Sequence, residues 1–141
     1  MKSEYINPFI RACRETFTNF LQLRVKRSAN LSVLRGQFPA SEIMGIIELT
    51  GKVRGTVVLG MHNQVACKLV SQLLGIEINE VDEDVLDGIG ELTNIISGAA
   101  AVQLTEYRIG VGLPVVVSDN QLSMYNDIKT PWIIIPMEAG D

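Results

Sequence analysis

The sequence predicts an α+β protein in which helices cover a mostly antiparallel β-sheet. Three segments carry apolar residues at three- and four-residue intervals, as amphipathic helices do. The segments between them are shorter and rich in β-branched residues, and a glycine connects two of them as in a hairpin. The chain of 141 residues has the length of one domain, so we expect residues 1–141 to form a single unit.

The N-terminal part predicts one helix followed by extended chain. Apolar residues recur at helical spacing from Asn7 to Leu23, and Asn7-Pro8 supplies an N-cap and a first-turn proline. After Leu23, apolar and polar residues alternate as far as Val33. We therefore expect a strand there, interrupted near Ser28 to Asn30.

A hairpin and a second helix are expected next. The apolar segments Ile43–Thr50 and Val53–Met61 flank Gly51-Lys52, and a glycine in so short a connection predicts a tight antiparallel turn. Asn63 is expected to cap a helix that ends at Gly75, where a left-handed residue is favoured.

The C-terminal half begins with a longer predicted helix, Asp82–Tyr107, whose acidic first turn suits the positive end of a helix dipole. The segments Arg108–Val117 and Trp132–Met137 are predicted to be strands. A short strand is expected between them, around Leu122–Tyr125.

Composition excludes several classes of protein. A formal net charge of -4 leaves no basic stripe for nucleic acid, and no run approaches the ~18 apolar residues of a membrane span. The single histidine, His62, and two distant cysteines, Cys13 and Cys67, share no metal-ligand spacing, so we expect no metal site and no histidine-based nucleophile. The N-terminus has no apolar run of a signal peptide, which predicts a cytoplasmic protein.

The long helix has two different sides on a helical wheel. One side is an apolar stripe that we expect in the core: Leu86, Ile89, Thr93, Ile96 and Ala100. The other stacks Asp87, Glu91 and Asn94 among small residues: Gly90, Ser97, Gly98 and Ala101. Two mid-helix glycines cost about 1 kcal/mol each relative to alanine, so helix stability does not explain this side, whereas the close approach of another surface does. Taken alone, the polar residues also fit an ordinary solvated face.

Residues 87–94 read DGIGELTN and resemble the signature of the CheC/CheX/FliY family of response-regulator phosphatases. That signature is an Asp or Ser, three residues, a Glu, two residues and an Asn on an exposed helix. The resemblance covers nearly all of the chain, and a single copy of the motif favours the CheX-like branch, because residues 15–19 of the first helix have the wrong spacing for a second copy. Family members commonly add a final strand, whereas this sequence stops at Asp141. The sequence therefore does not decide how the sheet edge is formed or whether a homodimer forms through the sheet.

The resemblance implies a phosphatase that acts on the phosphoaspartate of a CheY-like response regulator. In that interpretation, Asn94 aligns the attacking water, Glu91 pairs with the regulator's lysine, and Asp87, Gly90 and Gly98 support the interface. No cofactor is expected on this chain, because Mg²⁺ comes with the response-regulator partner. The alternative is a non-catalytic module that binds a response regulator or a flagellar-switch protein through the same helix.

Overall fold

The computed structural model describes residues 3–118, 121 and 131–140. Its elements, in chain order, are α1 (Ser3–Leu21), β1 (Val25–Arg27), β2 (Ser32–Leu34), β3 (Ile43–Thr50), β4 (Gly55–Met61), α2 (Asn63–Leu74), α3 (Glu83–Gln103), a 3-10 turn η1 (Thr105–Tyr107), β5 (Gly110–Val111), β6 (Val115–Ser118), β7 (Trp132–Ile134) and β8 (Met137–Ala139). The strand expected at Leu122–Tyr125 lies outside the described residues.

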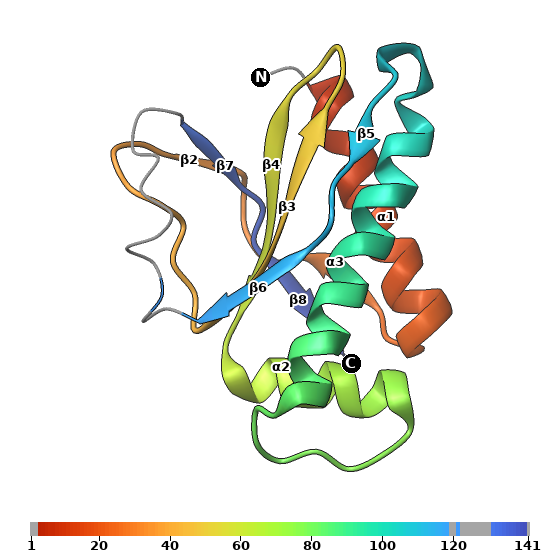
Figure 1. The fold of residues 1–141 in the computed structure, drawn as a ribbon, viewed down its shortest axis with the longest axis vertical. Helices are drawn as coiled ribbons and strands as arrows, with labels where there is room; N and C mark the ends of the chain where they lie inside the picture. Colours follow the sequence, from red (N-terminus) through yellow and green to blue (C-terminus); the bar gives the residue numbers. More distant parts are fainter. Residues whose placement is uncertain (1–2, 119–120, 122–130, 141) are drawn as a thin grey trace.

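The central sheet is built around β3. On one side β3 pairs antiparallel with β4, and on the other it pairs antiparallel with β5 and then β6. Figure 1 shows α1 and α3 side by side against one face of this sheet, with α2 across its lower end. The main core lies between the helices and that face, and its larger buried members include Phe17, Leu21, Ile43, Val70, Val85, Ile89, Leu92 and Ile96.

The other face of the sheet has a smaller core. Met44, Ile46 and Val117 are buried there, and Phe38 packs against them. The Phe38 ring meets Trp132 of β7 edge to face, with ring centroids 5.1 Å apart. Two antiparallel ribbons, β1 with β8 and β2 with β7, complete the structure, so the predicted α+β class with antiparallel sheets is confirmed.

The first helix starts earlier than predicted. It begins at Ser3, so Pro8 lies inside it and not in its first turn. Tertiary contacts stabilise the added turn, because Ile6 is buried and the Tyr5 ring packs edge to face on Tyr107 at 5.2 Å. These contacts offset the cost of an interior proline.

The predicted hairpin is confirmed, but its connection is longer than the sequence indicated. The last pair of the ladder joins Leu49 to Gly55, so five residues make the turn. Gly51 has a φ of 115°, and the Lys52 N–H donates to the carbonyl of Tyr107 at 3.1 Å. The turn is therefore held by the connection that follows α3, a distant contact that local turn chemistry does not reveal.

The second helix ends as predicted and begins differently. Gly75 adopts the left-handed conformation, with a φ of 71°. At the start, Asn63 does not cap the helix with its side chain, and the cap position is His62. The carboxylate of Glu42 instead accepts a hydrogen bond from the Asn63 N–H at 3.1 Å, so a residue from another segment satisfies this end.

Three of the predicted strands are divided. The strand expected at Trp132–Met137 gives β7 and β8, which pair with different strands. The strand expected from Leu23 to Val33 is interrupted after Arg27, as predicted, and yields β1 and β2. The single strand expected at Arg108–Val117 is instead split into β5 and β6. Between them, residues 47–48 of β3 face residues 112–114, so the split is a bulge of one extra residue.

By length and composition alone, α3 could cross a membrane. Half of its apolar window is buried inside the fold, as expected for a core helix. In the described part of the chain, no other helix meets the same criteria.

Candidate functional site

The candidate site is the exposed side of α3, and the sequence determines where this helix begins. Asp82 is the N-cap, and its side chain accepts a hydrogen bond from the Val85 N–H at 3.0 Å. Glu83 and Asp84 fill the first turn, where negative charge favours the helix dipole. The helix ends at Gln103, four residues before the predicted end, because the chain tightens into the 3-10 turn η1.

The structure places Asp87, Glu91 and Asn94 together on the exposed side of α3, as predicted. They lie within about 60° of one another on the helix, at a spacing of about 1.5 Å of rise per residue. The opposite side is buried at Ile89, Thr93, Ile96 and Ala100, which confirms most of the predicted core stripe. Leu86 is the exception, with 39% of its surface exposed near the helix N-terminus.

The small residues predicted around this polar side fall into two groups. Gly90 and Ser97 are buried, so they do not belong to the exposed surface. A Cβ atom at Gly90 would lie 3.3 Å from Val116 Cγ2 and 3.8 Å from Pro114 Cγ, which shows that Gly90 faces the β5–β6 segment. Its place in a partner-binding surface stays a prediction, and its burial gives a packing reason for the glycine instead. Gly98, by contrast, has nothing within 4 Å of the position that a Cβ would occupy, and it lies open beside Asn94.

Close packing fixes the position of α3. A Cβ at Gly45 of β3 would lie 3.0 Å from Thr93 Cβ, and one at Gly88 would lie 2.6 Å from Val70 Cγ2 on α2. Both glycines therefore let α3 approach its neighbours more closely than any side chain would allow. The residue after Thr93 is Asn94, so the contact of Thr93 with β3 also sets the distance of Asn94 from the sheet.

Asp87, Glu91 and Asn94 make no hydrogen bond or ion pair with the rest of the described chain. Their two carboxylates and one carboxamide are thus available to another molecule. A carboxylate can bind a cation, and a carboxamide can hold a water with one atom while its other atom contacts a neighbour. Within the described residues, no group of three or more His, Cys, Asp or Glu side chains could hold a metal ion.

The comparisons with known proteins agree with the motif on α3. The family model for the chemotaxis phosphatase CheX matches residues 43–138, well over half of the chain. The chain belongs to the CheX family. The CheY-P phosphatase CheX of Thermotoga maritima is 29% identical over 127 residues, which cover 88% of this chain and 81% of that protein.

Two solved structures show the same fold. A CheC-like superfamily protein from Shewanella sp. PV-4 superposes with a TM-score of 0.77 at 21% identity, covering 98% of this chain and 99% of that one. CheX in the CheX–CheY–BeF3–Mg²⁺ complex of Borrelia burgdorferi superposes with a TM-score of 0.68 at 18% identity, covering 97% and 98%. The prediction that the chain is a CheX-like phosphatase is confirmed at the level of the family.

The cysteines are not reactive groups in this CheX-family protein. Burial raises the pKa of the Cys13 thiol to about 11, against a weaker opposing effect of Arg14. Burial also raises the pKa of Cys67, with Asp82 and Glu80 adding to the effect. Both thiols stay protonated near neutral pH, and Cys67 is buried while Cys13 is partly buried.

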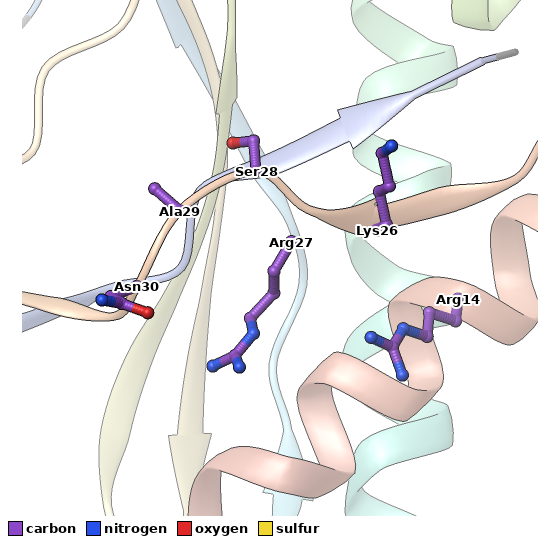
Figure 2. Close-up of a pocket in the computed structure, with 6 residues that line it drawn as sticks. All are labelled: Arg14, Lys26, Arg27, Ser28, Ala29 and Asn30. Carbon is purple, nitrogen blue, oxygen red and sulfur yellow. The ribbon is translucent and has the colours of Figure 1, made fainter.

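Sequence reasoning did not find a basic hollow of about 630 Å³ between α1 and the segment after β1. Figure 2 shows the side chains that line it: Arg14, Lys26, Arg27, Ser28, Ala29 and Asn30. The run Arg24–Arg27, three basic residues around Val25, was the signal in the sequence. The charged side chains that line the hollow, Arg14, Lys26 and Arg27, are all exposed. Glu138 of β8 lies opposite Lys26 in the ladder, and its negative charge weakens the positive potential of the hollow.

Proposed function

We propose that this protein removes the phosphoryl group from the phosphoaspartate of a CheY-like response regulator in chemotaxis or a related two-component pathway. The observation that carries this proposal is the exposed pair Glu91 and Asn94 on one side of α3, with no partner in the described chain. The family match and the similarity to the CheY-P phosphatase of Thermotoga maritima support it. A cytoplasmic location and a homodimer stay predictions.

In this mechanism Asn94 enters the active site of the regulator and positions the water that attacks the phosphorus in line. Phosphoryl transfer requires positioning and placed charges more than covalent participation, so an amide can suffice. An aspartate at the same position would bring negative charge towards the phosphoryl oxygens. The carboxamide is neutral and offers both donors and an acceptor, which a water-orienting group needs.

Glu91 anchors the complex in this mechanism. It lies three residues before Asn94, so the two side chains project from the same side of α3 at different heights. We assign Glu91 an ion pair with the lysine of the regulator, at the rim of the site that Asn94 enters. Asp87, one turn earlier, supports the interface. Mg²⁺ comes with the regulator, as in the Borrelia complex, which contains CheY and Mg²⁺ together.

Phosphate release from a phosphorylated CheY-like regulator tests the proposal. We expect Asn94→Ala to lower the maximal rate by on the order of 100-fold, comparable to the loss of one oxyanion-stabilising donor. Asn30→Ala is the matched control, because Asn30 is exposed on a different part of the molecule. Wild-type rates for Asn94→Ala at saturating protein would contradict the assignment.

The same assay separates the enzyme from a non-catalytic docking module. A module would bind the regulator without accelerating phosphate release, whereas the proposed phosphatase does both. Glu91→Ala should weaken association and leave the maximal rate nearly unchanged, because its role lies at the interface. Glu77→Ala, an exposed carboxylate before α3, controls for the simple loss of one negative charge.

A further inference from the structure

The bulge between β5 and β6 exposes a large apolar side chain. Leu113 lies in the bulge and is 89% exposed, the highest value among the large hydrophobic residues that the structure describes. The bulge is anchored on both sides of it, since the Gly112 N–H donates to the Glu48 carbonyl at 2.9 Å and Pro114 packs towards Gly90. The backbone around Leu113 is thus fixed while its side chain points away from the fold.

The packing of Pro114 towards Gly90 implies that Leu113 lies towards the Asn94 end of the polar side of α3. In Figure 1 the chain runs from β5 down beside α3, antiparallel to it, before β6 turns away from the helix. Pro114 lies at the level of Gly90, and one strand residue spans about as much length as two helix residues. The residue before Pro114 therefore lies further along α3, near the level of residues 92–94. Of the three exposed polar residues Asp87, Glu91 and Asn94, Asn94 lies nearest on the helical wheel to the side that Gly90 presents to this segment.

An apolar side chain at this place would supply buried apolar contact area, which the polar side of α3 lacks. Asp87, Glu91 and Asn94 offer charge and hydrogen bonds, which give specificity more than affinity. Protein interfaces take much of their binding energy from a few well-packed side chains that lose their contact with water near the centre of the interface. Bulges recur next to active sites, where they redirect one side chain, and this bulge redirects a leucine.

We propose that Leu113 is an apolar anchor for the response regulator and packs on its surface beside the phosphoaspartate while Asn94 enters the site. This inference rests on the proposed function and adds a binding determinant to it. The continuity of Leu113 with the Glu91–Asn94 surface is what assigns it to the regulator and not to a second copy of this chain.

Binding of a CheY-like regulator activated with beryllofluoride and Mg²⁺ tests the proposal, together with phosphate release from the phosphorylated form. Burial of one leucine side chain corresponds to an affinity change of about 10- to 100-fold, so Leu113→Ala should raise Kd and KM by that factor. Its maximal rate should stay within about twofold of wild type. Leu113→Met, which keeps an apolar side chain of similar volume, should restore most of the affinity.

Leu31→Ala is the matched control, because Leu31 is an exposed leucine just before β2, away from α3. Unchanged Kd and KM for Leu113→Ala would overturn the proposal, as would a change in oligomeric state without loss of regulator affinity. Asn94→Ala separates the two claims, since it should bind the regulator and fail in turnover. If the wild type binds the regulator without turnover, the proposed function fails, and the Kd of Leu113→Ala still decides the role of Leu113. If the wild type does not bind the regulator at all, both the proposed function and the role of Leu113 are overturned.

Discussion

The contact between Gly45 and Thr93 should be the packing feature on which the position of Asn94 most depends. Gly45 lies in the middle of β3, and Thr93 is fully buried, with its Oγ1 donating to the Ile89 carbonyl at 2.7 Å. A methyl group at position 45 would lie 3.0 Å from Thr93 Cβ and 3.3 Å from Cγ2, and closer still to Oγ1. Neither element can yield easily, because both are held in the core.

Gly45→Ala should therefore overpack this contact. Inserting a methyl group into a filled core costs about 1–3 kcal/mol, while the lower entropy of the unfolded chain returns roughly 0.4–1 kcal/mol. The free energy of unfolding should fall by about 1–2 kcal/mol, which lowers Tm by several degrees for a chain of this size. Because α3 must move outward or tilt, the variant should also lose phosphatase activity in its folded state.

Urea denaturation followed by circular dichroism measures the effect, with Thr93→Ala and the double variant completing a cycle. The double variant should recover at least about 1 kcal/mol relative to the sum of the single changes, since the hydroxyl that clashes is gone. Gly55→Ala is the control, because nothing lies within 4 Å of a Cβ there. Additive effects, or a Gly45→Ala variant as stable as wild type, would refute the packing argument.

Two further predictions concern the exposed side of α3 and the partly buried thiol of Cys13 on α1. Gly98→Ala should raise the free energy of unfolding by about 0.5–1 kcal/mol, through helix propensity, and still lower kcat/KM for the regulator; equal or better kcat/KM would exclude Gly98 from the interface. The thiol of Cys13 ionises near pH 9 in the unfolded chain and near 11 in the fold, so the unfolded state loses its proton first. Between these values stability should fall as pH rises, by on the order of 2–3 kcal/mol, and denaturation of Cys13→Ala across the same range should lack this component.

The sequence predicted the exposed side of α3 well, because helical periodicity alone decides which residues share a side. The sequence did not show which side of α3 packs against the β5–β6 segment of the sheet. Gly90 lies about 60° from Asp87 on the helical wheel, at the edge of the polar side, and Pro114 and Val116 pack against it. Leu86 shows the opposite case, since its position on the apolar stripe did not ensure burial near the end of the helix.

The bulge could not be predicted from the sequence. Residues 108–117 are apolar almost throughout, which indicates a strand without marking where its register changes. The shift becomes visible only through the pairing with β3, where three residues face two. The early start of α1 has a similar origin, because Tyr5 is held by the ring of Tyr107, a residue more than 100 positions away.

The three glycines of α3 have different explanations, and the difference bears on function. Gly88 faces Val70 and Gly90 faces Val116, so tight packing inside the fold offsets the roughly 1 kcal/mol that each costs the helix. Gly98 costs the helix as much, and the space around its Cβ position is open. Packing at the Cβ position does not explain Gly98, whereas a surface that approaches α3 next to Asn94 would. The proposed docking of the regulator on Asn94 and Leu113 would provide such a surface, so Gly98→Ala should stabilise the free protein and weaken the complex.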